Sequence, residues 1–363
     1  MHGRRERGAQ HLHQEQLTVV WYVVAIIAVA FIFDFSNGFH DSANAIATIV
    51  GTRVLSPLAA VIWAAFFNFA ALFTGSVAVA KAVGGGMIEQ SIVDPNVILA
   101  ALLGAIAWNI ITWAYGIPSS SSHALIGGYA GSAMAKAGLA AITWGPKWIQ
   151  TLSFIVISPL VGFLVGYAIM VACYWIFQRM SASKADRVFR PAQVVSSAFM
   201  AYSHGGNDAQ KTMGIILGLL VATKATFARE TGILHHLYVA DFTTIPRWVE
   251  VGAYSAISLG TLFGGWRIVH TMGSRITKLR PISGFAAETG GALAIQLATH
   301  WGIPVSTTHT ITGAIVGVGA TQRLSAVRWG IAGRIVWAWV LTIPAAGIMA
   351  ALSYLALSQM IHP

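Results

Sequence analysis

Charged side chains are scarce in this chain of 363 residues. Asp, Glu, Lys and Arg make up 9% of it, whereas globular domains carry about 25%. Hydrophobic residues make up 56%, which excludes a soluble protein with one or two ordinary cores and indicates a membrane protein. Because a bilayer-crossing helix needs about 20 mostly apolar residues, the chain has material for roughly ten crossings and little for an extramembrane domain.

Other absences narrow the class of protein. Cys173 is the one cysteine, so no intrachain disulfide can form. The phosphate loop G-x-x-x-x-G-K-[ST] is missing, which excludes ATP hydrolysis by the chain itself. The motifs H-E-x-x-H and G-x-S-x-G are missing too, which argues against an intramembrane metalloprotease and a serine hydrolase. We therefore expect neither enzymatic activity nor a cofactor.

The net charge of +10 comes from 22 Lys and Arg against 12 Asp and Glu. We attribute this excess to basic cytoplasmic loops and expect no nucleic-acid partner. Two connectors separated by two spans hold much of the charge, so both should face the cytoplasm: Arg179, Lys184, Arg187 and Arg190 in the first, and Arg267, Arg275, Lys278 and Arg280 in the second. Arg4, Arg5 and Arg7 would prefer the same side, which conflicts with an odd number of spans before residue 179 and leaves the orientation of the ends open.

Apolar runs occupy most of the chain. They cover residues 17–38, 55–80, 97–115, 124–138, 150–177, 192–222, 248–266, 282–300, 308–320 and 331–358. Since such runs are too long and too uniformly apolar for barrel strands, we predict an all-α, polytopic membrane protein with about ten to twelve membrane segments. Its parts are a polar N-terminal tail without a signal-peptide cleavage site (1–16), a first transmembrane repeat (17–178), a basic cytoplasmic connector (179–191) and a second transmembrane repeat (192–363).

Two polar motifs occur twice, in the same order. Residues 36–44 (SNGFHDSAN) match residues 203–211 (SHGGNDAQK) at an offset of 167. Residues 116–123 (GIPSSSSH) match residues 302–309 (GIPVSTTH) at an offset of 186. Duplicated halves with Gly- and Pro-interrupted apolar segments are typical of secondary transporters, whose sites lie at the repeat interface. The halves are inverted if each contains an odd number of crossings.

Acidic residues inside apolar runs are the first candidates for a functional site. Asp34, Asp41, Asp208 and Glu288 lie there, although a charge at a helix centre costs about 2.5–3.5 kcal/mol on insertion scales. Asp41 and Asp208 occupy matching repeat positions, whereas a purely structural pairing remains open for Asp34 and Glu288. Gly38 and Gly205 suggest that each motif unwinds in mid-membrane to hold a cation or proton. His40 would let that pocket titrate near neutral pH, or it would only bond a backbone carbonyl.

The Gly-Ile-Pro segments are better suited to an anion. Proline should end one half-helix and begin the next, which exposes backbone N–H groups at a positively polarised helix start. Rows of hydroxyls surround each start, and two such tips facing one another would hold one oxyanion: Ser119, Ser120, Ser121 and Ser122 in the first, and Ser306, Thr307 and Thr308 in the second. Ordinary N-capping is the alternative. Lys211 could complement a phosphate, pair with Asp208 or reach the surface, and His123 and His309 could brace the tips through hydrogen bonds.

Taken together, these segments resemble the inorganic phosphate transporter (Pit) family, in particular its bacterial low-affinity permease branch. The resemblance rests on residues 38–48, 203–214 and 284–290 with both Gly-Ile-Pro segments, and covers nearly the whole chain. It implies a cation-driven phosphate symporter with two inverted repeats, each with a re-entrant Pro-Ser/Thr helical hairpin. It implies a phosphate site built from the seven hydroxyl residues above, and a cation or proton site that draws on Asp41, Asn44, Asn207 and Asp208.

Two departures from the family pattern bear on the coupling ion. Sodium-coupled members show Asn-Asp in both signatures and a later Asn in the second, whereas here the first reads His40-Asp41 and Lys211 replaces the later Asn. Both changes resemble the proton-coupled bacterial branch and put a full pair of Na⁺ sites in doubt.

The sequence therefore predicts a phosphate:H⁺ symporter that sits in the lipid bilayer of a bacterial inner membrane and works by alternating access. Lys211 is added to the phosphate site, and His40 and Glu288 to the coupling site. A Na⁺-coupled phosphate symporter and a transporter of sulfate or another oxyanion are the alternatives, followed by an anion channel and a membrane hydrolase. Free phosphate and a metal–phosphate complex both remain open as cargo, as do a monomer and a homodimer.

Overall fold

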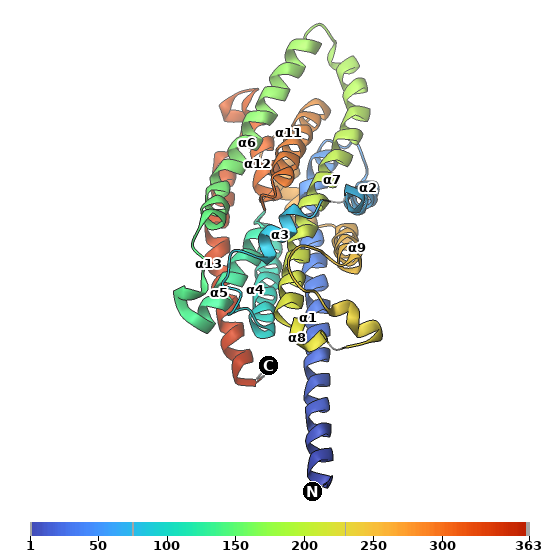
Figure 1. Ribbon diagram of the computed structural model, residues 1–363. Helices are drawn as coiled ribbons and strands as arrows, with labels where there is room; N and C mark the ends of the chain where they lie inside the picture. Colours follow the sequence, from blue (N-terminus) through green and yellow to red (C-terminus); the bar gives the residue numbers. More distant parts are fainter. Residues whose placement is uncertain (1, 75, 229, 361–363) are drawn as a thin grey trace.

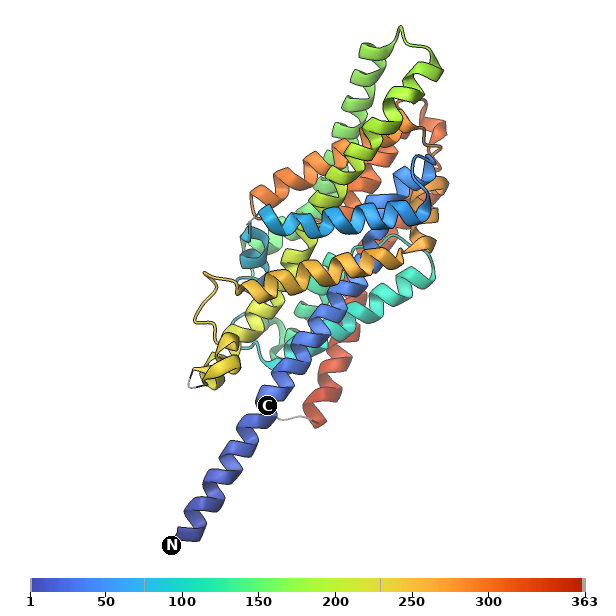
Figure 2. The same ribbon diagram turned by 90° about the vertical axis from the view of Figure 1, so that its right-hand side faces the viewer.

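The computed structural model describes residues 2–74, 76–228 and 230–360, with side chains for residues 17–73, 76–228 and 230–360. The predicted polar tail (1–16) lies outside the described side chains; the backbone of residues 2–16 continues the first helix. The chain forms a bundle of helices of very unequal length (Figures 1 and 2). The prediction of an all-helical protein is confirmed: the described residues contain no β-strand, only one isolated bridge between Ile88 and Ile142.

The helices follow the apolar runs closely. They are α1 (His2–Gly51), α2 (Pro57–Ala70), α3 (Ala78–Gly84), α4 (Pro95–Ala114), α5 (Ser121–Ala137), α6 (Pro146–Phe177), α7 (Ala182–Ala222), α8 (Lys224–Phe227), α9 (Arg247–Phe263), α10 (Trp266–His270), α11 (Pro281–His300), α12 (Thr307–Ala320) and α13 (Trp329–Met360). A π-helical turn, Thr271–Arg275, continues α10, and short 3₁₀ turns lie at Ala71–Thr74, Gly138–Ala141, Gly232–Leu237 and Leu324–Ala326.

Only some of these helices are long and apolar enough to cross a bilayer by themselves. In the described part of the chain, four stretches are long and apolar enough to cross a bilayer: Leu17–Gly51, Pro95–Ala114, Pro146–Phe177 and Trp329–Met360. Pro57–Phe73 and Ala78–Gly84, bent by 84° at a short break, make a fifth if they count as one span. Helices α5 and α12, with 17 and 14 residues, are shorter than a full crossing. The count of ten to twelve segments stays a prediction.

Both long motif helices are continuous, so the predicted unwinding at Gly38 and Gly205 is wrong. α1 and α7 run through these glycines without a break. The glycines serve close packing instead: a Cβ at Gly38 would lie 2.0 Å from the Ile257 carbonyl oxygen on α9, and one at Gly205 would lie 2.7 Å from the Asn68 carbonyl oxygen on α2. Small residues of this kind let helix backbones approach each other within a membrane.

The Gly-Ile-Pro segments do separate pairs of helices, as predicted. Gly116 and Gly302 adopt left-handed φ values of 64° and 68° just after α4 and α11, where a side chain would be strained. The next amide closes each end, since Ile117 N donates to Thr112 O and Ile303 N donates to Ala298 O, both at 2.9 Å.

The position of the helix starts differs from the prediction, however. Pro118 lies in the extended segment, and α5 begins at Ser121 because the Ser120 hydroxyl accepts the His123 amide as an N-cap. The second segment is built in the same way: Ser306 caps α12 through the His309 amide.

The two halves of the chain interlock. α5 packs on α13 and α12 packs on α6, so each capped helix of one half lies against the last long helix of the other. In the same way α1 packs on α9, and α7 packs on α2. Elements of both halves therefore meet inside the bundle (Figure 1).

The two basic connectors lie at one end of the bundle, as predicted. A cavity of about 530 Å³ there is lined by residues of both, among them Met180, Asp186 and Arg280. Arg190 also donates to the Arg53 carbonyl, which places the end of α1 beside them. α7 begins at Ala182, within the predicted connector 179–191. The N-terminus lies at the opposite end (Figure 1).

The close glycine contacts predict a difference in stability between neighbouring positions. Gly38→Ala and Gly205→Ala should each lower the free energy of unfolding by about 1–3 kcal/mol, because the new methyl group would push packed backbones apart. Gly206→Ala is the matched control, since its Cβ would meet only Ala71 Cβ at 3.7 Å. Thermal unfolding of purified protein in detergent measures the difference. Equal melting temperatures for all three variants would contradict this packing.

Candidate functional site

A stripe of polar residues follows one face of α1. Asp34, Asn37, Asp41, Asn44 and Thr48 are spaced three or four residues apart, which places them above one another on a helix. Each is at most 2% exposed. Because buried polar groups require hydrogen-bond partners, the neighbours of this stripe define the polar centre of the protein.

Asp41 forms the first part of the site together with the start of α5. Its carboxylate accepts from the Ser121 hydroxyl at 2.6 Å and lies 2.6 Å from His40 Nδ1. Ser121 Oγ also lies 2.6 Å from Asn37 Oδ1. The other ring nitrogen of His40, Nε2, lies 3.0 Å from the Thr112 hydroxyl. The predicted coupling residues His40 and Asp41 are therefore in direct contact with the first hydroxyl row.

The remaining serines of the first row have different surroundings. Ser119 donates to the Thr112 hydroxyl at 2.9 Å and lies 3.4 Å from His40 Nε2. The Ser120 hydroxyl is occupied as the N-cap of α5. Ser122 accepts from Lys211 Nζ at 2.5 Å, which links α5 to α7.

Lys211 organises the second part of the site. It is only 2% exposed, and its ammonium group donates to Ser122 Oγ, to Asp208 Oδ1 at 2.5 Å and to the Val305 carbonyl at 2.7 Å. These three acceptors use all three N–H donors of the ammonium. The other oxygen of Asp208 accepts from the Thr307 hydroxyl at 3.0 Å.

The two predicted asparagines point to different places. Asn44 donates to the Thr307 and Thr308 hydroxyls at 3.1 and 3.0 Å, so it joins α1 to the start of α12. Asn207 instead donates to the Thr299 hydroxyl at 2.8 Å and lies beside the Ile303 carbonyl, where it braces the end of α11. The Ser306 hydroxyl caps α12, as Ser120 caps α5.

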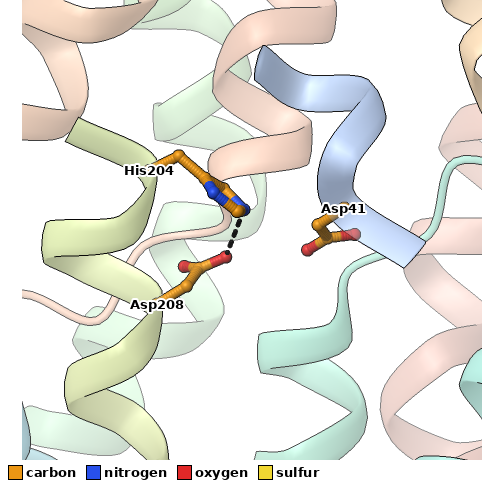
Figure 3. A group of neighbouring side chains, drawn as sticks. All are labelled: Asp41, His204 and Asp208. Atoms are coloured by element: carbon orange, nitrogen blue, oxygen red, sulfur yellow. Dashed lines mark ion pairs between the residues drawn. The ribbon is translucent and has the colours of Figure 1, made fainter. Parts of the chain in front are cut away.

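The two aspartates of the repeated motifs meet across the interface between the halves. Ligand atoms of Asp41, His204 and Asp208 all lie within 4.8 Å of one another, on α1 and α7 (Figure 3). His204 Nε2 lies 3.2 Å from Asp208 Oδ2, and its Nδ1 lies 3.2 Å from Asn68 Oδ1. This cluster has the chemistry to share a proton or to hold one cation.

His204 is a residue that the sequence interpretation missed. It occupies the repeat position of Asn37 by the offset of 167. Asn and His thus occupy opposite positions in the two motifs: the first has Asn37 and His40, and the second has His204 and Asn207 at the equivalent positions. Each aspartate keeps one imidazole beside it, and reading the motifs for this exchange would have found His204.

Glu288 lies apart from the other predicted coupling residues. Its carboxylate on α11 accepts from the Thr48 hydroxyl at 2.6 Å, from Gln193 Nε2 at 2.9 Å and from the Ser196 hydroxyl. Thr48 is seven residues beyond Asp41 on α1, which corresponds to about 10 Å along the helix axis. The structure therefore brings Glu288 to the end of the polar stripe and not to the two aspartates.

His123 and His309 lie against each other where the two helix starts meet. Their rings meet edge to face with centroids 4.8 Å apart, and His309 stacks on Trp339 at 4.0 Å. Both nitrogens of His309 lack a hydrogen-bond partner among the described residues. Trp339 in turn donates to the Pro118 carbonyl at 3.1 Å. Ring contacts therefore join the two helix starts at this point.

The starts of α5 and α12 therefore come together at one place, with hydroxyls and an ammonium group between them. Helix starts carry a partial positive charge and free N–H groups, which favour anions. Every predicted site residue is at most 2% exposed, so the site is enclosed on all sides. A site built in this way can bind a small oxyanion, and the adjoining acids can take up a cation or protons.

Comparison with known proteins agrees with this geometry. Residues 37–350 match the model of the phosphate transporter family. A probable low-affinity inorganic phosphate transporter of Rhizobium meliloti (strain 1021) is 54% identical over 92% of this chain and 96% of its own length. One of Bacillus subtilis (strain 168) is 44% identical over 93% and 97%.

A solved structure is similar in fold. It is described as "The sodium-dependent phosphate transporter" and superposes with a TM-score of 0.81 at 24% identity, covering 94% of this chain and all of that chain. These relatives are transporters and not enzymes, and the apolar helices fit a multi-pass membrane protein. With the family model spanning most of its length, the chain belongs to the phosphate transporter family.

Proposed function

We propose that this protein imports inorganic phosphate across the inner membrane as a proton-coupled symporter that works by alternating access. The observation that carries the proposal is the meeting of two capped helix starts around Lys211. Its ammonium group bonds Ser122 of α5 and the Val305 carbonyl just before α12, so both starts lie within reach of one small anion.

Phosphate would be held mainly by neutral donors. Ser121 and Ser122 come from the first turn of α5, and Thr307 and Thr308 from the first turn of α12. Each helix start adds free N–H groups. Lys211 is the one Lys or Arg side chain hydrogen-bonded to these hydroxyl rows among the described residues, and phosphate would replace Asp208 or the Val305 carbonyl as its partner. Ser120 and Ser306 contribute by holding the helix starts in place, and Ser119 by holding His40.

Protons are the favoured coupling ion because each aspartate has an imidazole beside it. His40 lies 2.6 Å from Asp41, and His204 lies 3.2 Å from Asp208. Imidazole is the side chain that changes its charge near neutral pH, and protonation of such pairs would offset the charge of an incoming phosphate. A single Na⁺ bound by the carboxylates is the alternative, so the tests below compare both ions.

Two features support alternating access: the enclosure of the site and the interlocking of the halves. Phosphate cannot reach residues that are at most 2% exposed unless helices move. The pairs α5–α13 and α12–α6 are equivalent in the two halves, as expected of two inverted repeats that rock against one another. The basic connectors assign their end of the bundle to the cytoplasm.

The coupling assignment predicts that Asp41→Asn and Asp208→Asn each reduce gradient-driven phosphate uptake to the background level. Both substitutions keep the side-chain shape but remove the site at which a proton would bind. The measurement is uptake of labelled phosphate by proteoliposomes under an imposed pH gradient or an imposed Na⁺ gradient. Asp241→Asn, at an exposed position near the bundle surface, is the matched control and should behave as the unaltered protein.

Normal uptake by both site variants would remove these aspartates from the coupling mechanism. Uptake that responds to a Na⁺ gradient but not to a pH gradient would replace protons by Na⁺ as the coupled ion. Equal inhibition by sulfate and unlabelled phosphate would broaden the substrate to oxyanions in general.

The substrate assignment predicts that removing hydroxyls weakens phosphate binding. Ser122→Ala, Thr307→Val and Thr308→Val should each lower phosphate affinity by about 10- to 100-fold, because a hydrogen bond to a charged group contributes about 1.5–3 kcal/mol. Equilibrium binding of labelled phosphate to purified protein provides the measurement. Ser132→Ala is the control, since that buried α5 hydroxyl donates only to the Tyr129 carbonyl. Unchanged affinity in all three site variants would place the phosphate site elsewhere.

A further inference from the structure

Asp34 is a buried acid that the functions proposed so far do not use. It is 0% exposed, and one oxygen accepts from the Thr212 hydroxyl of α7 at 2.9 Å. The other oxygen has no hydrogen-bond partner among the described residues. Its position is one end of the polar stripe on α1, two helical turns before Asp41.

An ionised carboxylate would be poorly accommodated there. A buried charge is strongly disfavoured unless it is paired and fully hydrogen-bonded, and a single hydroxyl leaves one oxygen unsatisfied. The charged groups that act on Asp34 are Asp208 and Lys211, both on α7, and they are already paired with each other at 2.5 Å. A proton on the unsatisfied oxygen removes the unfavourable charge.

Asn37 lies between this acid and the proposed coupling site. It follows Asp34 by about one turn on the same face of α1, and its Oδ1 lies 2.6 Å from Ser121 Oγ. Ser121 has one hydroxyl proton and two acceptors at 2.6 Å, Asn37 and Asp41. When Asp41 is ionised, the Ser121 hydroxyl donates its hydrogen bond to Asp41. When Asp41 is protonated it donates to Ser121, which then donates to Asn37. The protonation of Asp41 therefore changes the hydrogen bonding of Asn37, the residue next to Asp34 in the polar stripe.

We propose that Asp34 is a second proton-binding site of the transport cycle, which takes up a proton on the side of the bundle opposite the basic connectors and exchanges it as phosphate crosses. This inference rests on proton coupling as proposed above. Its position supports it, because Asp34 precedes Asp41 by seven residues on α1 and so lies on the N-terminal side of the proposed site, away from the end of α1 where Arg190 contacts Arg53.

The acid occurs in one half only. By the offset of 167, the repeat position of Asp34 is Ala201 on α7, and the position of its partner Thr212 is Ala45 on α1. Asp41 and Asp208 are duplicated, but the Asp34–Thr212 pair is not. A proton site present in one of two equivalent halves would serve one of the two access states.

The experiment compares Asp34→Asn and Asp34→Glu with the unaltered protein in proteoliposomes. Two quantities are measured: phosphate accumulation under a pH gradient of about one unit, with the proton-to-phosphate flux ratio from an internal pH dye, and phosphate counterflow without a gradient. Asp34→Asn should keep counterflow but lose about tenfold in accumulation, because each coupled proton contributes a factor of ten per pH unit. The number of protons transported per phosphate should fall by one in this variant. Asp34→Glu should retain both activities.

Two results would overturn the inference while leaving proton coupling intact. One is an Asp34→Asn variant with the accumulation and flux ratio of the unaltered protein. The other is loss of counterflow in both variants, which would make Asp34 a structural group. Failure of the unaltered protein to respond to a pH gradient would instead remove the proposed coupling itself, and the role of Asp34 with it.

Discussion

The need to satisfy buried polar groups on α1 is the constraint on which the rest of the structure depends. A helix inside an apolar bundle has no water to bond its Asp, Asn and Thr side chains. Asp34 is therefore met by α7, Asp41 by the start of α5, Asn44 by the start of α12 and Thr48 by α11. Four elements from both halves of the chain converge on one helix face, and the proposed functional site is the middle of that convergence.

Close packing makes this convergence possible. Gly127 on α5 abuts the Ile343 backbone of α13, and Gly313 on α12 abuts the Pro159 backbone of α6. A Cβ at either glycine would lie 2.4 Å or less from a carbonyl oxygen, so both contacts require glycine. They are equivalent in the two halves, and they hold the short capped helices against long ones. These contacts hold the two short helices in position, and the hydroxyls in their first turns, Ser122 and Thr307, bond Lys211 and Asp208.

The sequence allowed much of this arrangement to be predicted, because the informative residues are local in their effect. Gly116 and Pro118 mark the break before α5 whatever packs around them, and the repeat offset links Asp41 to Asp208 directly. The break at Gly38 was a wrong prediction for a physical reason. A glycine is equally compatible with a break in a helix and with a close contact between two helices. At Gly38, the contact with α9 shows that the second applies. The place of Glu288 at the end of the polar stripe could not be predicted, since it depends on how α11 crosses α1.

The occupied ammonium group of Lys211 has a consequence for affinity. All three of its donors already have protein acceptors, one of them the carboxylate of Asp208. A phosphate ion that binds Lys211 as proposed must therefore replace an existing partner, and its binding free energy would be the difference between two similar charge-assisted bonds. Such an exchange is nearly balanced in both directions. The protein would bind phosphate weakly and release it readily, which suits a carrier whose turnover depends on substrate release.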